Sequence, residues 1–129
     1  MYKWIVVILI VVMSFIFYNN NRKEEGYQKM NPVDARLQLE EDSNILLIDV
    51  RTQEEYMQKH IEGSKLIPLN VLESKIKKAV PNKEKKIILY CQTGSRSAAA
   101  ANMLLNMGYK NVHDLGGINK WPYETKGSL

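Results

Sequence analysis

The residues best suited to chemistry lie in a short stretch that begins at Cys91 and ends at Arg96. Gly94 can adopt a positive φ angle, so this stretch can curl and turn several backbone N–H groups toward its centre. The thiolate is the reactive form of cysteine, and amides, a helix N-terminus or a nearby cation lower the pKa of a thiol. The pattern therefore predicts a cysteine nucleophile in an anion-binding loop, with Arg96 adding permanent positive charge.

A strand before this loop and a helix after it would hold the loop in place. The apolar run at 87–90 has the β-branched and aromatic residues of a buried strand, and Cys91 stands at its carboxyl end. Four alanines favour a helix over 97–107, and Gly108 suits its end. The apolar face of that helix would contain Ala98, Ala101, Leu104 and Leu105. A strand-end cysteine alone would indicate an inert core residue; the glycine, serine and arginine that follow favour a nucleophile.

Two charged residues, Asp49 and Arg51, close an earlier apolar run at 45–48 that also indicates a buried strand. The carboxyl ends of parallel strands meet at one edge of a sheet, so both side chains can lie near the cysteine, where Arg51 would attract an anionic substrate. The structural alternative, which we favour, is that Asp49 caps the next helix while Arg51 forms a half-exposed ion pair with Glu54 or Glu55.

Three stretches of the sequence resemble the rhodanese family of sulfurtransferases. The segment Cys-Gln-Thr-Gly-Ser-Arg-Ser at 91–97 is similar to the active-site loop of that family. The segment Asp-Val-Arg-Thr-Gln-Glu-Glu-Tyr at 49–56, with the residues up to Pro68, is similar to its other signature, except that Lys59 stands where the family usually has glycine. The stretch from Gly108 to Trp121 resembles the family's C-terminal ending. Three ordered blocks are a more specific signal than one loop.

The resemblance, which covers roughly residues 30–122, implies sulfur transfer at Cys91. Its thiolate would take the outer sulfur of a small anionic donor such as thiosulfate, and a thiol, cyanide or an acceptor protein would then accept the sulfur from the resulting persulfide. Asp49 and Arg51, at the end of the earlier strand, are candidates for residues that surround the loop without binding the donor themselves. The expected active-site loop, which binds the substrate, consists of Gln92, Thr93, Gly94, Ser95 and Arg96. No metal or other cofactor is expected, because the sequence has no cysteine–histidine cluster with metal-ligand spacing.

Two other functions would use the same residues. Cysteine phosphatases and arsenate reductases have five residues between cysteine and arginine, whereas Cys91 and Arg96 have four between them. The shorter loop fits one sulfur atom better than a tetrahedral oxyanion. A membrane-tethered binding or redox-sensing module would keep the fold for its partners and use the thiolate to sense oxidants. Rapid reaction with peroxide, without turnover of a sulfur donor, would distinguish the sensor from the sulfurtransferase that we favour.

The N-terminal segment has the composition of a membrane anchor. Residues 4–18 contain no charge, and as a helix they would span about 22 Å. A cleaved signal peptide is the alternative, but bulky residues stand where a small-residue cleavage site is needed. We expect a single-pass transmembrane anchor at 1–18 and a catalytic domain on the cytoplasmic side. The basic residues after the anchor outnumber the positive groups before it, and a lone thiol suits a reducing compartment. These basic residues are Arg22, Lys23 and Lys29.

The remainder of the 129-residue chain is long enough for one domain. We expect a polar linker at 19–26, the domain at 27–123 and a loose C-terminal tail at 124–129. Strands and helices alternate, which predicts an α/β fold with a central parallel sheet of about four or five strands, helices on both faces and Cys91 on a central strand. A net charge of +4 without a basic, aromatic-interleaved patch gives no indication of nucleic-acid binding, and one cysteine excludes an internal disulfide.

Weaker signals place the remaining elements. Asn31, Pro32 and Asp34 have the spacing of a helix N-terminus. The other expected elements are a strand at 27–30, a helix at 33–39, a strand at 65–67, a helix at 71–80, a strand at 111–115, a glycine turn at 116–117 and a short helical segment up to Trp121, which packs in the core. His60 lies at a helix end, where we expect a structural role rather than that of a base. The lysines at 75–86 indicate a solvated face, with contact to anionic lipid as the alternative.

Overall fold

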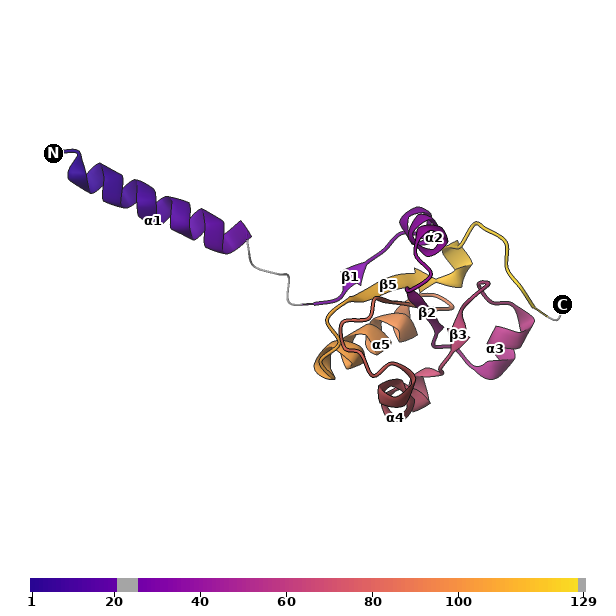
Figure 1. The fold of residues 1–129 in the computed structure, drawn as a ribbon. Coiled ribbons are helices and arrows are strands. Elements are labelled where there is room, and N and C mark those ends of the chain that lie inside the picture. Colours follow the sequence, from indigo (N-terminus) through magenta and orange to yellow (C-terminus); the bar gives the residue numbers. More distant parts are fainter. Residues whose placement is uncertain (21–25, 128–129) are drawn as a thin grey trace.

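A sheet of five parallel strands forms the centre of the domain (Figure 1). The computed structural model describes residues 1–20 and 26–127. In spatial order the strands are β1 (Gln28–Lys29), β5 (Val112–Gly117), β4 (Ile87–Cys91), β2 (Leu46–Asp49) and β3 (Lys65–Leu66). Every neighbouring pair is parallel, and the strand that carries the cysteine is the middle one. The predicted sheet and the central position of this strand are confirmed.

The middle strand is apolar on both faces because helices cover the sheet on both sides. All five residues of β4 are buried. One face packs against α4 (Leu69–Ala79) and α5 (Ser95–Asn106), whose apolar side chains join one core cluster with it. On the other face lies α2 (Pro32–Glu41), whose Ala35 is buried in the same cluster as Tyr90. Helices on both faces were expected from the alternating pattern, and this prediction is confirmed.

Capping explains where α2 begins. The side chain of Asn31 accepts a hydrogen bond from the backbone N–H of Asp34 at 2.8 Å, and its amide group donates to the Asp34 carboxylate at 3.0 Å. Pro32 occupies the first turn, where its missing N–H has no cost. The helix therefore starts where the sequence predicts and continues to Glu41, beyond the predicted end.

The next helix, α3 (Gln53–Gln58), starts with a capping box formed by Thr52 and Glu55. The hydroxyl oxygen of Thr52 accepts from the Glu55 amide at 3.2 Å, and the Glu55 carboxylate accepts from the Thr52 amide at 3.2 Å. The expectation that Asp49 caps this helix is therefore wrong. Asp49 is still part of β2, and Thr52 is the residue that adjoins the helix.

Two boundaries around the cysteine loop differ from the prediction. α5 begins at Ser95 rather than at 97, because Gly94, with a φ of 113°, forms its N-cap. The glycines at 116–117 belong to β5, where they pair with the last two residues of β4, so the predicted glycine turn is wrong. A short 3-10 helix, η1 (Ile118–Lys120), follows directly. The buried residues of α5 are Ser97, Ala100, Ala101 and Leu104, whereas Ala98 and Leu105 are half-buried.

The lysines at 75–86 form a solvated face only in part. The three lysines of α4 are exposed, as expected. Lys83 instead donates to the carbonyl of Met107 at 2.9 Å, and its ammonium group lies 4.1 Å from the centre of the Tyr109 ring. Lys86 donates to the side-chain oxygen of Gln38. Lys83 and Lys86 therefore hold neighbouring elements together.

The N-terminal helix, α1 (Lys3–Asn20), has no buried residue. Its 18 residues are long and apolar enough to cross a membrane, a criterion that an N-terminal signal sequence also meets. The predicted linker at 19–26 falls mainly on residues outside the described part of the chain, and Arg22 and Lys23 lie among them.

The C-terminal segment returns to the domain. Backbone groups of His60 and Lys126 exchange two hydrogen bonds, at 2.7 and 2.8 Å. Tyr123 also contacts the domain, because the guanidinium of Arg36 lies 4.3 Å from the centre of its ring. The expectation of a loose tail is therefore wrong up to residue 127, and residues 128–129 lie outside the described residues.

Candidate active site

Cys91 is the last residue of β4, where the chain turns into the loop singled out above. Its side chain is completely buried. The sulfur accepts a hydrogen bond from the backbone N–H of Gly94 at 3.0 Å and lies 3.5 Å from the hydroxyl oxygen of Ser97, in the first turn of α5. The loop thus curls around the sulfur, with the N-terminus of a helix beside it.

These hydrogen bonds favour the thiolate. Burial raises the pKa of the Cys91 thiol, but hydrogen bonds from the Ser97 hydroxyl and from the amides of Ser97, Gly94 and Thr93 lower it by more. The pKa of the thiol therefore lies below its ordinary value. A thiolate is the nucleophilic form of cysteine, so the site can attack an electrophilic sulfur.

A glycine of β5 leaves room for the loop. Gly117 pairs with Cys91, and a Cβ atom on it would lie 2.5 Å from the carbonyl oxygen of Gln92 and 2.8 Å from the Cα of Thr93. Backbone atoms cannot approach a real Cβ so closely, so any other residue would push the loop away from the strand. The sequence pattern predicts a turn at this glycine and gives no signal for its contact with the loop.

The pair of Asp49 and Arg51 is buried behind the loop. Their side chains are 0% and 2% exposed, and a terminal guanidinium nitrogen of Arg51 lies 2.7 Å from a carboxylate oxygen of Asp49. The other terminal nitrogen donates to the side-chain oxygen of Gln92 at 3.1 Å. The expectation of a half-exposed pair between Arg51 and Glu54 or Glu55 is therefore wrong, because the nearer partner at the end of the same strand is Asp49. The structure brings this pair to the loop through Gln92.

Arg96 forms a two-pronged ion pair with Glu55 of α3. Its terminal nitrogens lie 2.6 and 2.9 Å from the two carboxylate oxygens, and the side chains are 34% and 29% exposed. Hydrogen bonding to Arg96 lowers the pKa of the Glu55 carboxyl to about 2, against an opposing effect of burial. The loop cation expected from the sequence is therefore compensated by a carboxylate that our sequence analysis did not assign to the site.

The other predicted residues of the loop differ in exposure. Thr93 and Ser95 are exposed, whereas Gln92 and Gly94 are half-buried. The backbone of the loop lies against the glycines of β5. Ser95 is the first residue of α5.

His60 lies apart from this arrangement. Its ring stacks on that of Tyr56 with 3.8 Å between the centres, and its Nδ1 atom is 2.8 Å from the Tyr56 carbonyl oxygen. Both contacts join the histidine to Tyr56 of α3, four positions earlier in the chain. This geometry agrees with the structural role that we expected for the histidine.

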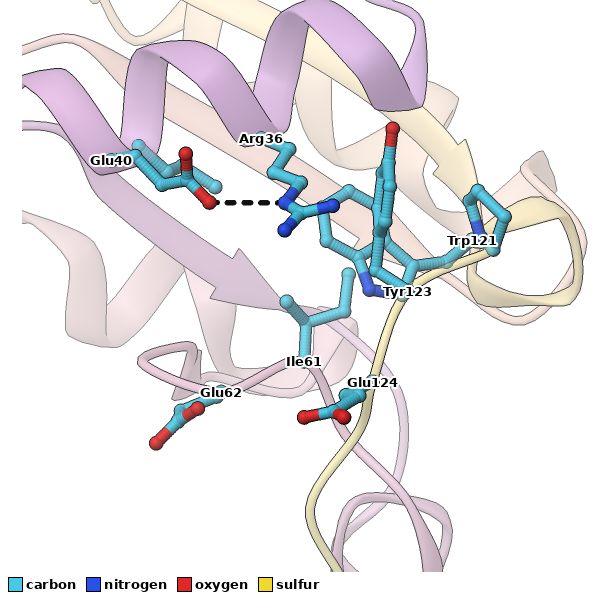
Figure 2. A pocket seen from close by; sticks show the side chains of 9 residues that line it. Arg36, Glu40, Ile61, Glu62, Trp121, Tyr123 and Glu124 are labelled. Carbon is cyan, nitrogen blue, oxygen red and sulfur yellow. Dashed lines mark hydrogen bonds and ion pairs between the residues drawn. The ribbon is translucent and has the colours of Figure 1, made fainter.

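A cavity of about 640 Å³ lies away from the cysteine, between α2 and the C-terminal segment (Figure 2). Arg36 and Glu40 of α2 form an ion pair at its edge, and Trp121 and Tyr123 face it from the C-terminal segment. Trp121 packs partly into the core, as predicted, with its indole nitrogen buried and without a partner among the described residues. Cys91 is not among the described residues that line this cavity, so we do not place the active site there.

A second cavity, of about 370 Å³, adjoins the cysteine loop directly. Thr93 and Gly94 line it from the loop, and Lys29 and Lys120 line it from β1 and η1. Both lysines are exposed, and the acidic residue Asp114 lines the same cavity.

Comparison with known proteins agrees with this geometry. The family of rhodanese-like domains matches residues 31–124. The thiosulfate sulfurtransferase PspE of Escherichia coli is 41% identical over 71 residues, which are 55% of this chain and 68% of that protein. A solved structure of a rhodanese with anions from E. coli has a TM-score of 0.61 at 34% identity, covering 65% of this chain and 99% of that one. The chain belongs to the rhodanese-like domain family and is a rhodanese-like sulfurtransferase.

Longer relatives contain this domain as one part. The probable adenylyltransferase/sulfurtransferase MoeZ of Mycobacterium tuberculosis is 36% identical over 101 residues, which are 78% of this chain but 26% of that protein. The chain therefore spans about a quarter of MoeZ. The family resemblance of the three sequence blocks is confirmed.

Proposed function

We propose that the protein moves sulfane sulfur from a small anionic donor such as thiosulfate to a thiophilic acceptor through a persulfide on Cys91. The observation that carries this proposal is the sulfur environment: the Gly94 amide and the Ser97 hydroxyl contact a thiol whose pKa is lowered. The similarity to PspE, which bears the name thiosulfate sulfurtransferase, supports the choice of donor.

The reaction has two steps. The Cys91 thiolate attacks the outer sulfur of thiosulfate, the sulfur–sulfur bond of the donor breaks, and sulfite leaves with the bonding electron pair. The negative charge then resides on the outer sulfur of the persulfide. A nucleophilic acceptor, such as cyanide or a thiolate, attacks that outer sulfur in the second step, and the Cys91 thiolate is released. Charge is conserved in both steps, and neither step needs a metal, an oxidant or a reductant.

The loop would bind the transferred sulfur and the donor. We assign this role to the backbone amides of residues 92–95 and to the side chain of Arg96, because amides at a helix N-terminus stabilise negative charge. Asp49 and Arg51 would position the loop through the hydrogen bond to Gln92. Because Cys91 has no exposed surface, the atoms that cover its sulfur must move before the donor can reach it.

Intact-protein mass spectrometry of the full chain in detergent tests this function. We expect a gain of one sulfur atom after incubation with thiosulfate, loss of this gain after addition of cyanide, and no gain in a Cys91→Ser variant. A free thiol that gains no sulfur from thiosulfate or from another sulfane-sulfur donor would contradict the proposal.

A redox-sensing role is the second candidate, and the lowered pKa of the thiol supports it. The burial of Cys91 does not separate the two candidates, because the oxygen of a sulfenic acid and the outer sulfur of a persulfide both need space at the same atom. Fast formation of a sulfenic acid with peroxide, without sulfur gain from any donor, would favour the sensor. The four residues between cysteine and arginine argue against a phosphatase, as described for the sequence.

We also propose that α1 is a single-pass membrane anchor that keeps the domain on the cytoplasmic side. Support comes from its length, its apolar composition and the absence of any buried residue in it. Aromatic residues near its ends, Tyr2, Trp4 and Tyr18, suit the membrane interfaces. Protection of the domain from added protease in intact cells, and digestion after lysis, would support this side; digestion in intact cells would contradict it.

A further inference from the structure

Glu55 of α3 forms hydrogen bonds both to the N-cap of its own helix and to the arginine of the cysteine loop. One carboxylate oxygen accepts from the backbone N–H of Thr52 at 3.2 Å and from its hydroxyl at 3.1 Å. Both oxygens also pair with the two terminal nitrogens of Arg96. The capping box therefore fixes the carboxylate on α3, and the carboxylate in turn fixes the arginine of the loop.

The consequence for charge is that both arginines near the loop are already compensated. Arg51 is paired with Asp49, at 2.7 Å, and Arg96 is paired with Glu55, at 2.6 Å. Arg96 and Cys91 still interact through their charges. The pKa of Arg96 is raised mainly by its hydrogen bond to Glu55, and the negative charge of the Cys91 thiolate also raises it. A donor at the sulfur is therefore exposed to the charge of an arginine that is already paired with a carboxylate.

We propose that Glu55 is a specificity-determining residue that weakens the preference of the site for dianionic donors relative to monoanionic ones. This inference rests on the sulfur transfer proposed above and concerns the charge of the donor: sulfane-sulfur compounds with a single negative charge, such as thiosulfonates and organic persulfides, become better able to compete with thiosulfate. Each negative charge on the donor is attracted by Arg96 and repelled by Glu55. The repulsion energy from Glu55 is about twice as large for a dianion as for a monoanion. Glu55 therefore reduces the difference in attraction to the site between the two kinds of donor.

The same chemistry applies to a monoanionic donor. The Cys91 thiolate attacks the terminal sulfur of methanethiosulfonate, the sulfur–sulfur bond breaks, and methanesulfinate leaves with the electron pair. The product on the protein is again the persulfide. Methanethiosulfonate has a methyl group where thiosulfate has an oxygen, so the two donors differ mainly by one charge and offer the same transferable sulfur.

The experiment compares two neighbouring glutamates of α3. Glu55→Gln keeps the shape of the side chain, and glutamine also serves in a capping box, so the variant removes the charge while keeping the local fold. Glu54→Gln is the matched control, because Glu54 is exposed and makes no hydrogen bond or ion pair within the described residues. The measured quantity is the ratio of two second-order rate constants for persulfide formation, thiosulfate over methanethiosulfonate, at one pH and low salt.

We expect Glu55→Gln to raise this ratio about three- to tenfold, and Glu54→Gln to change it less than about twofold, because an exposed charge is screened more strongly. Added salt should reduce the rise of this ratio in Glu55→Gln. A merely structural role of Glu55 would slow both donors equally and leave the ratio unchanged, and that result, or a lower ratio, would overturn the inference while the sulfur transfer stands. A wild-type chain that forms a persulfide with neither donor would overturn both proposals.

Discussion

Ser97 has more acceptors around its hydroxyl than it can serve. The oxygen lies 3.0 Å from the carbonyl of Gly94, 3.5 Å from that of Gly116 and 3.5 Å from the sulfur of Cys91. A hydroxyl has one hydrogen, so it donates to one of these atoms at a time. A charged acceptor forms the stronger hydrogen bond, so deprotonation of the cysteine draws the hydroxyl hydrogen to the sulfur.

We therefore expect Ser97→Ala to raise the pKa of the Cys91 thiol. The rate of alkylation by iodoacetamide follows the thiolate fraction, so its midpoint on the pH axis would move to a higher pH than in the wild type. Burial opposes the thiolate in both proteins, and the variant lacks one of the hydrogen bonds that outweigh it. Ser74→Ala, on the exposed side of α4, is the control and should not move the midpoint. An unchanged midpoint in Ser97→Ala would assign the lowered pKa to the amides alone.

Among the single residues of the candidate site, only those with a local sequence signal could be predicted. The cysteine, Gly94 and Arg96 could be predicted because they lie within one short segment with a distinctive composition. Glu55 could not, because it meets Arg96 across 41 positions of the chain, and its local pattern is that of an ordinary helix start. The contact of Gly117 with the loop depends in the same way on the pairing of two strands that are distant in the sequence.

Three elements meet at the guanidinium of Arg51. It pairs with Asp49 at the end of β2, donates to the carbonyl of Lys59 after α3 at 2.5 Å, and reaches Gln92 in the loop at 3.1 Å. The charge is buried, so its interactions are not screened by solvent as those of a surface pair are. This side chain therefore joins a strand end, a helix end and the cysteine loop.

Replacement of this arginine should destabilise the protein strongly. We expect Arg51→Met to lower the free energy of unfolding by about 3–5 kcal/mol, because it leaves the Asp49 carboxylate buried without a partner. The measurement is urea denaturation followed by circular dichroism. The double variant Asp49→Asn/Arg51→Met removes the uncompensated charge as well and should recover part of the loss. Equal losses in the single and double variants would show that the cost comes from packing rather than from charge.

The elements themselves were largely predictable, and their ends were not. Apolar runs and the cap at Asn31 are local signals, and they correctly indicated the strands and α2. The start of α5 depends on the φ angle that Gly94 adopts in the loop, and the end of β5 depends on pairing with β4. Both are set by the tertiary structure. The burial of Asp49 and Arg51 follows likewise from the helices that cover the sheet.

At the scale of the whole molecule, the anchor that we propose for α1 would decide where the domain works. If α1 is an anchor, the full-length chain should remain in the membrane pellet after an alkaline carbonate wash. A variant with Ile8→Lys and Val11→Lys places two charges in the middle of the helix and should be released, because charges are costly in the hydrocarbon core. Intact mass of the protein in the pellet and in the supernatant separates the alternatives: a supernatant chain shortened within the first residues after α1 would identify a cleaved signal sequence.

The central position of β4 in the sheet also determines the order in which parts of the domain unfold locally. Amide hydrogens exchange with solvent first where strands are short and at an edge, which describes β1 and β3, two residues each. β4 is paired with β2 on one side and β5 on the other, so its amides should be among the last to exchange. The cysteine is thus attached to the most protected part of the molecule. Frequent small openings at the edges leave its surroundings intact, and activity on warming should persist until the whole domain unfolds.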